Sequence, residues 1–201
     1  MKVMNRLQII AKPKNLILFI FLLFAFYSHL KANKGTVQSD LETQKIDSLL
    51  NLSLHYINSI NDTAILLSEE ALNIAQNYNS QKLQSKALYN LGYLYYRWGK
   101  LDSAQKHLEE SSTLARRISD SLRIGIAINR LGNVYWHKGE HLKAKEYFER
   151  ARDIHKNLKN DKEIGRTINN LANIYREWNN YQRAIKLYLE ALRYYARANY
   201  R

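Results

Sequence analysis

Apolar residues along most of the chain recur at steps of three and four, the spacing of one face of an α-helix. Between residues 122 and 161, one such face comprises Ile124, Ile128, Leu131 and Tyr135, and a second comprises Ala144, Phe148, Ala151, Ile154 and Leu158. Gly139 separates the two faces, and a glycine at such a point predicts a tight turn. The pattern therefore predicts two helices joined at Gly139.

The same pattern recurs every 40 residues. Positions in the same register are Leu91, Leu131 and Leu171; Gly92, Gly132 and Ala172; Tyr95, Tyr135 and Tyr175; Ala104, Ala144 and Ala184; Leu108, Phe148 and Tyr188; and Ser111, Ala151 and Ala191. This density of matches indicates a repeat array, in which stacked neighbours bury apolar faces that a single helix pair leaves open. With one proline and seven glycines, the chain offers few turns for a many-stranded β fold.

Polar residues mark the expected helix starts. Asn160, with Glu163 three residues later, has the spacing of a capping box, and Asp120 is a second candidate cap. Gly132 falls inside a helix, where glycine costs about 1 kcal/mol relative to alanine. We therefore expect the partner helix to cross Gly132 at close range, with Ala144 as the facing small residue.

These register positions resemble the tetratricopeptide repeat family, whose pattern runs through Leu-Gly, Tyr, Ala, an aromatic residue and Ala. The family's usual period is about 34 residues, so a period of 40 implies longer helices. The resemblance implies an all-α, right-handed solenoid of antiparallel helix pairs. It implies clear repeats at residues 82–121, 122–161 and 162–201, preceded by a degenerate first repeat at residues 41–81.

The first 32 residues have a different composition from the rest of the chain. Basic residues Lys2, Arg6, Lys12 and Lys14 precede the apolar run Leu16–Tyr27. That run is shorter than the ~20 residues of a membrane span and fits the ~7–15-residue core of a signal peptide. We expect residues 1–32 to be a cleaved signal peptide or a membrane anchor that associates through residues 15–30, followed by a linker at residues 33–40. Either would export the repeats to the periplasm or the extracytoplasmic side of a membrane.

Composition and motifs exclude several classes of function. Lys and Arg number 31 against 18 Asp and Glu, a net charge of +13 that alone would suggest nucleic acid, but an exported chain rarely meets nucleic acid. The absence of cysteine excludes a disulfide scaffold and a thiolate zinc site. The sequence has no P-loop, dinucleotide fingerprint, zinc-protease motif or nucleophile elbow. His137 and His141 are four residues apart, but the turn at Gly139 lies between them. They would therefore not share a helical face, which speaks against a metal site there. We therefore predict no enzyme activity, no cofactor and no metal site.

The resemblance implies that the first helix of each repeat lines a groove for extended peptides. The corresponding residues are Lys86, Tyr89, Asn90, Tyr93 and Tyr96; then Asn129, Arg130, Asn133, Trp136 and His137; then Arg166, Asn169, Asn170, Asn173 and Arg176. Asparagine can pair with a peptide backbone and arginine with carboxylates, so the expected ligand is a protein or peptide, acidic where the arginines contact it. The asparagines can equally bond to one another between repeats, and both interpretations remain open.

The last predicted helix is apolar on all sides. It carries Leu187, Tyr188, Ala191, Leu192, Tyr194, Tyr195 and Ala198. Repeat arrays normally end in a helix with a polar outer face, so we expect a dimer through this helix or a C-terminal extension. The architecture resembles the N-terminal sensory part of bacterial signalling proteins, which implies a sensory or docking role. The alternative is a self-contained envelope adaptor that dimerises through its C-terminal helix.

Overall fold

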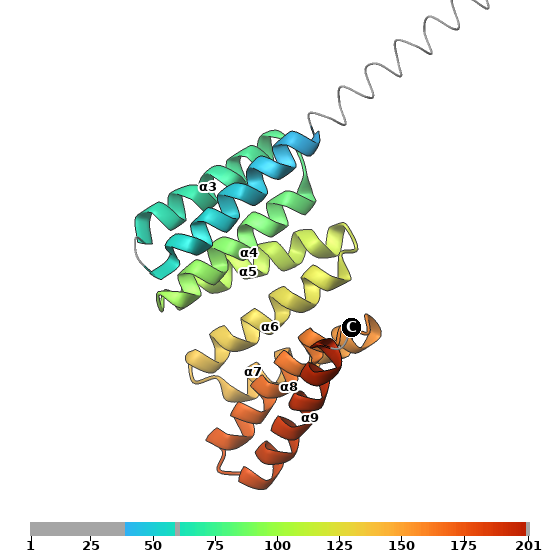
Figure 1. Cartoon of the computed structure of the whole chain (residues 1–201). Helices are drawn as coiled ribbons and strands as arrows, with labels where there is room; N and C mark the ends of the chain where they lie inside the picture. The colour runs from blue at the N-terminus through green and yellow to red at the C-terminus, as the bar shows by residue number, and fades with distance from the viewer. Residues whose placement is uncertain (1–38, 59–60, 200–201) are drawn as a thin grey trace, which may run out of the picture. The chain divides into compact units, whose positions relative to one another are not determined.

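The computed structural model describes residues 39–58 and 61–199, and every regular element within these ranges is helical. Residues 39–55 are helical and lead into a 3-10 turn, η1 (Tyr56–Asn58). Seven further helices follow (Figure 1): α3 (Asn61–Asn77), α4 (Gln81–Arg97), α5 (Leu101–Arg117), α6 (Ser121–His137), α7 (His141–Asn157), α8 (Asp161–Glu177) and α9 (Tyr181–Asn199). The all-α prediction is confirmed.

The predicted signal or anchor segment, residues 1–32, lies outside the described residues. The same holds for residues 33–38 of the expected linker, whereas residues 39 and 40 are already helical. Within the part of the chain that the structure describes, no helix has the length and apolar character needed to cross a membrane.

The same turn ends each helix from α3 to α8. Residues with positive φ occur 20 positions apart at Asn79, Gly99, Ser119, Gly139, Lys159 and Asn179, with φ between 50° and 79°. At Gly139, its N–H donates to Trp136 O at 3.0 Å and the next N–H, of Glu140, donates to Tyr135 O at 2.9 Å. This pair of bonds is a Schellman motif, which satisfies the last carbonyls of a helix and stops it. The predicted turn at Gly139 is confirmed, and it recurs throughout the array.

Side-chain caps begin the first helix of each clear repeat. The Asp120 carboxylate accepts the Arg123 N–H at 2.9 Å, and the Asn160 side chain accepts the Glu163 N–H at 3.2 Å, as predicted. Both bonds satisfy a backbone donor that the helix itself leaves open. The Glu163 carboxylate instead accepts two bonds from Arg166, both at 2.9 Å.

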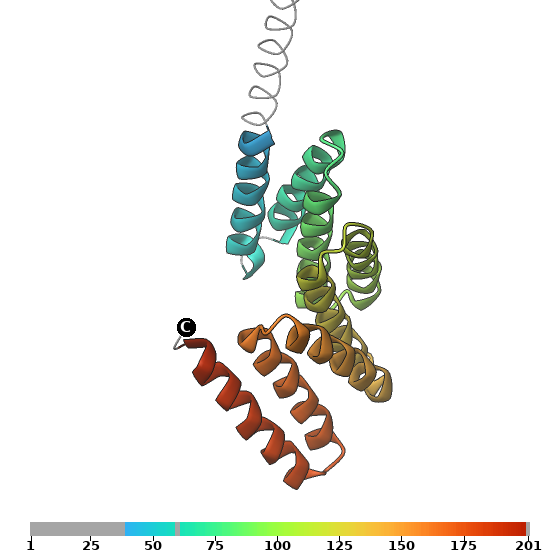
Figure 2. The same cartoon turned by 90° about the vertical axis from the view of Figure 1, so that its right-hand side faces the viewer.

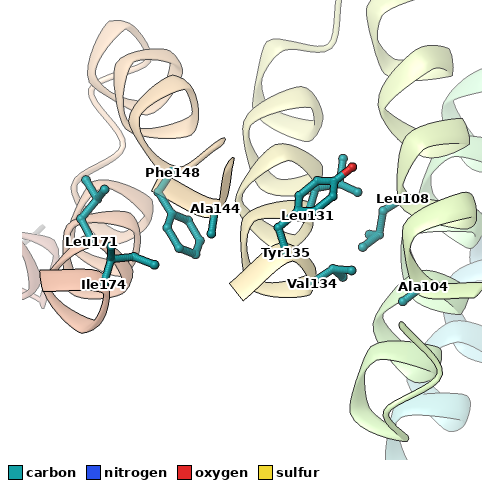
Figure 3. Close-up of a cluster of buried hydrophobic side chains, with 9 residues drawn as sticks. All are labelled: Ala104, Leu108, Leu131, Val134, Tyr135, Ala144, Phe148, Leu171 and Ile174. Carbon is teal, nitrogen blue, oxygen red and sulfur yellow. The ribbon is translucent and has the colours of Figure 1, made fainter. Parts of the chain in front are cut away.

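Each helix packs against the next one along the chain, and α4, α6 and α8 also contact one another in turn (Figures 1 and 2). The central apolar cluster joins α5, α6, α7 and α8 (Figure 3). Leu108, Leu131, Tyr135, Phe148 and Leu171 are all at most 2% exposed in it. Most of the register positions read from the sequence therefore lie in the core. Because α4 contacts α6 and α6 contacts α8, these three helices form one continuous layer.

The mid-helix glycines mark close crossings, as predicted. A Cβ atom on Gly92 would lie 2.6 Å from Leu108 Cγ and 3.2 Å from the carbonyl oxygen of Ala104. Gly132 is covered in the same way by the ring of Phe148. The large side chain of the second helix, more than the facing alanine, therefore fills the space that each glycine provides.

Candidate functional site

The residues predicted to line a groove all lie on α4, α6 and α8. Because α4 contacts α6 and α6 contacts α8, these side chains belong to one layer of the array. Their individual contacts divide them into two groups. The polar atoms of one group make hydrogen bonds or ion pairs within the protein. The side chains of the other group keep polar atoms that make no such bonds among the described residues.

Two of the asparagines tie helices together. Asn90 is 5% exposed, and its amide donates to Ser53 Oγ at 2.6 Å and to Ser68 Oγ at 3.0 Å. Asn129 is 3% exposed and accepts a bond from the Asn170 amide at 3.1 Å. A buried side-chain amide that is hydrogen-bonded within the protein has a structural role. Asn90 joins α4 to serines of the two preceding helices, and the Asn129–Asn170 bond is an asparagine pair between repeats of the kind that the sequence left open.

The other asparagines differ from one another. The Asn173 side-chain oxygen accepts the Tyr188 hydroxyl at 2.6 Å, a bond between α8 and α9. Asn133 and Asn169 are half-buried, and neither makes a side-chain hydrogen bond within the described part of the chain. Asn133 and Asn169 are therefore the asparagines whose amides can meet a peptide.

Most of the cations predicted to line the groove already have acidic partners. The ion pairs are Lys86 with Asp47, Arg166 with Glu163 and Arg176 with Glu177. Arg130 differs, because among the described residues no acidic side chain approaches it within 4.0 Å. The structure thus singles out one cation of the predicted set.

Tyrosines surround Arg130. Its guanidinium carbon Cζ lies 4.5 Å from the centre of the Tyr93 ring and 5.4 Å from the centre of the Tyr96 ring. Its Nη2 donates to the Tyr89 hydroxyl at a long 3.4 Å. Burial acts to lower the pKa of Arg130, but its contacts with the three tyrosines outweigh burial and raise that pKa, so the side chain stays charged. Burial also raises the pKa of Tyr96, which keeps its hydroxyl protonated.

A pocket of about 420 Å³ opens over this guanidinium. Its lining residues are Tyr93, Tyr96, Arg97, Arg130 and His137. The His137 ring stands edge-on to Tyr96, with ring centres 5.2 Å apart, and edge-on to Trp136, with ring centres 4.8 Å apart. The lining thus combines cations with two tyrosines, and none of the described residues that line it carries a carboxylate.

A second, smaller pocket of about 210 Å³ shares His137 with the first. Trp136, His137, His141 and Glu177 line it. Glu177 is held by Arg176 at 3.2 Å. The basic Arg130 pocket and this pocket with an acidic wall therefore adjoin at one imidazole. No group of three or more metal-binding side chains occurs among the described residues.

Comparison with known proteins identifies a family for the helical array. Models of the family described as "Tetratricopeptide repeat" match residues 85–117, which cover most of α4 and all of α5, and residues 123–197, which run from α6 into α9. The chain belongs to the tetratricopeptide repeat family. A repeat array of this kind is a protein-interaction scaffold, because stacked repeats present one extended surface. No protein of curated function matches the sequence.

Solved structures share the fold of this tetratricopeptide repeat chain at low identity. BtubC from P. vanneervenii is 22% identical, with a TM-score of 0.65 over 77% of this chain and 64% of that one. A Rap protein solved with Competence and Sporulation Factor is 18% identical, with a TM-score of 0.71 over 78% of this chain and 44% of that one. A signal transduction ATPase with a tetratricopeptide repeat sensor, from Pyrococcus horikoshii, is 20% identical, with a TM-score of 0.65 over 78% of this chain and 26% of that one. The chain therefore spans less than two thirds of each of these proteins.

The repeat register also locates residues of the pockets that the groove prediction omitted. Arg97, His137 and Glu177 are each the last residue of a first helix, 40 positions apart. Each of them lines one or both of the two pockets. Of the three, only His137 was among the expected groove residues. Comparing ionisable residues at equal register would have identified Arg97 and Glu177 from the sequence.

Proposed function

We propose that this tetratricopeptide repeat protein binds a peptide segment of a partner along the layer formed by α4, α6 and α8, without acting on it chemically. The observation that carries the proposal is Arg130, a charged and partly buried side chain that lines a pocket and has no acidic partner among the described residues. Asn133 lies on the same face of α6, and Asn169 adds a second amide from α8. The Rap protein crystallised with Competence and Sporulation Factor has a similar fold, which supports the proposal.

A library of random acetylated octapeptides, passed over the immobilised protein, tests the proposal. We expect the wild-type protein to retain a subset of peptides, and the Asn133→Ala/Asn169→Ala variant to retain them about tenfold less well, since each lost amide removes hydrogen bonds to the backbone. Asn157→Ala is the matched control, because Asn157 is exposed on α7, away from the layer. Retention of no peptide by the wild-type protein would contradict the docking function.

The second part of the proposal concerns where the protein is located. We propose that it is the exported sensory or docking component of a bacterial signal-transduction system, held at or beyond the membrane through residues 1–32. The basic segment followed by the apolar run Leu16–Tyr27 supports this. Fractionation of the native cells and intact mass of the recovered protein test it. We expect a periplasmic species lacking the signal segment or a membrane-bound one, whereas recovery from the cytosol at full mass would contradict export.

A second candidate function rests on α9. Its outer stripe of Ile185, Leu189 and Leu192 is 57%, 52% and 61% exposed. The matching positions are polar in the earlier repeats: Gln105, Glu109 and Ser112 on α5, and Lys145, Glu149 and Arg152 on α7. On α5 this face contacts the next helix pair, since Lys138 donates to Gln105 at 2.8 Å. An apolar stripe there favours an adaptor that dimerises through α9, with the same surface on both copies.

Light scattering tests this candidate. We expect a dimer for the wild-type protein and a monomer for Leu189→Glu, because a carboxylate in the stripe would be buried by pairing. Leu142→Glu is the control, since Leu142 is 73% exposed and lies on α7. A monomeric wild-type protein at micromolar concentration would exclude dimerisation through α9.

A further inference from the structure

We infer that the outer face of α9 lies on an anionic lipid surface. Two features of this helix carry the inference: the outer stripe of Ile185, Leu189 and Leu192, and a row of exposed cations beside it. The inference goes beyond peptide docking and does not depend on it. It gives the outer stripe a lipid partner in place of a second copy of the chain, and one experiment separates the two.

Among the described residues, α9 is buried along one side only. Ala184 and Ala191 are at most 2% exposed, and Ala191 belongs to a cluster of buried apolar residues shared with α8. α8 is the only helix in the described part of the chain that packs along α9 (Figure 2). Tyr181, which is 57% exposed, precedes Ile185 by four residues and extends the outer stripe towards the start of the helix. Large apolar side chains in one exposed line mark a site of interaction with a protein or a membrane.

The outer stripe differs from the face through which α5 stacks on the next helix pair. On α5, the corresponding Gln105 accepts a bond from Lys138 at 2.8 Å, and Glu109 accepts a long one from the Tyr135 hydroxyl at 3.4 Å. The corresponding positions on α7 all carry charged side chains. Stacking on α5 therefore uses polar groups at this register, whereas the outer stripe of α9 has only apolar ones. An apolar medium fits the stripe better than another helix pair of this kind.

The charge next to the stripe indicates what that medium is. Lys186, Arg193 and Arg197 are exposed and recur at steps of seven and four residues, so they share one helix face beside the outer stripe. None of these three cations, the basic row, forms an ion pair with a described residue. Glu190 is the only acidic residue of α9. A second α9 would therefore bring further cations, whereas an anionic surface supplies the charge that the basic row attracts.

An apolar stripe beside a row of cations is the pattern of a helix that lies in the plane of a membrane interface. Such a helix places its apolar side chains at the boundary of the acyl chains and its cations among the anionic headgroups. The basic segment and the apolar run Leu16–Tyr27, proposed above as a signal segment or anchor, would hold an uncleaved chain near the same surface. A tethered helix meets that surface at a high effective concentration, so α9 then needs only a weak contact of its own.

A fluorescent label on the outer stripe tests the inference. The sequence contains no cysteine, so Leu192→Cys in the full chain takes a single nitrobenzoxadiazole label, whose emission rises and shifts to the blue in an apolar medium. The labelled protein is mixed with vesicles of phosphatidylcholine alone, or of phosphatidylcholine and phosphatidylglycerol in equal parts. We expect the blue shift only with the anionic vesicles, and quenching of the shifted emission by a spin-labelled lipid. Leu142→Cys, at a 73% exposed position of α7, is the matched control and should keep the emission of a label in water.

Two charge variants assign the effect to the basic row. Lys186→Gln/Arg193→Gln should lower the ratio of inserted to water-exposed label about 25-fold, because each cation at an anionic surface contributes about fivefold. Lys106→Gln/Arg116→Gln removes the same charge from α5 and should change that ratio less than about twofold, since salt confines such attraction to short range. All four positions are exposed, so both variants should fold, which circular dichroism checks.

Each result supports or overturns the lipid surface. Label that stays in water with both kinds of vesicle would overturn it. Equal insertion into both kinds would overturn the role of the basic row and with it the assignment to anionic lipid. Label that is shielded before vesicles are added, to a degree that rises with protein concentration, would show that a second copy covers α9 and would overturn the inference in favour of the dimer. None of these results bears on peptide docking, which the octapeptide library tests separately.

Discussion

The ring of Phe148 lies against the backbone of Gly132, so that a Cβ atom on Gly132 would come within 2.5 Å of the ring atom Cε1. Phe148 is 1% exposed and belongs to the cluster that joins α5 to α8. The ring therefore has little room to move away. This contact explains why a residue with poor helix propensity stands in the middle of α6.

Gly132→Ala should for this reason destabilise the protein, although alanine is the better helix former. Overpacking a filled core costs about 1–3 kcal/mol, which exceeds the gain of at most about 1 kcal/mol in helix propensity. Gly165→Ala is the matched comparison, because its Cβ would lie at a looser 3.1 Å from the half-buried Tyr195 ring. Chemical denaturation should show the larger loss of unfolding free energy for Gly132→Ala. Equal losses would mean that the Phe148 contact does not set the cost.

The turns allow a stabilising prediction. Lys159 lies in the turn after α7 with a φ of 52°, a left-handed conformation that costs a residue with a Cβ about 1–2 kcal/mol. Lys159→Gly removes that strain but adds freedom to the unfolded chain, so we expect a net gain of about 0.5–1 kcal/mol in unfolding free energy. Gly139→Lys, at the equivalent turn with a φ of 79°, is the reverse experiment and should lower stability. A loss of stability in Lys159→Gly would contradict this account of the turns.

Local features of the fold were predictable from the sequence because they depend on near neighbours in the chain. The helical faces, the caps at Asp120 and Asn160 and the Gly139 turn are of this kind. The sequence does not predict which of the groove residues bond within the protein, because this depends on contacts between helices. Asn133 and Asn173 occupy the same register. Of the two, only Asn173 accepts a hydrogen bond within the described residues, from a tyrosine 15 residues away on α9.

The sequence predicts only in part that Arg130 lies among tyrosines without an acidic partner in the described residues. Glu163 stands three residues before Arg166 on one helix, a spacing that predicts their ion pair. By contrast, the tyrosines that hold Arg130 lie on another helix, about one repeat earlier in the chain. Their approach follows from the stacking of α4 on α6, which a repeat period implies only in outline.

His155 gives the protein a pH dependence. Its ring is fully buried and packs on Gly125, and burial lowers the pKa of His155, opposed by the nearby Glu163 carboxylate and aided by Arg166. Below the unfolded-state pKa of about 6.5, the unfolded chain binds a proton that the folded chain does not. The stability contributed by the neutral ring is therefore complete above that pH and declines as pH falls.

Thermal unfolding between pH 7.5 and pH 5 measures this effect. The wild-type unfolding free energy should fall by up to about 1.4 kcal/mol per pH unit on account of His155. His155→Gln should flatten that slope, whatever its stability at neutral pH. His137→Gln, a change at an exposed position, should leave the slope in place. An unchanged slope in His155→Gln would assign the pH dependence to other groups.

Asn90 and Asn133 should respond in opposite ways to the same substitution. Asn90→Ala removes the donor to Ser53 and Ser68 in the buried centre of the first two repeats, and the lost bonds should cost about 1–3 kcal/mol of stability. Asn133→Ala removes no hydrogen bond within the described part of the chain, so its effect on stability should stay within about 0.5 kcal/mol. Chemical denaturation measures both values.

Peptide retention should fall for Asn133→Ala and persist for Asn90→Ala at temperatures where the Asn90→Ala variant is folded. The reverse outcome would place the ligand contact at Asn90 and refute the division of the asparagines.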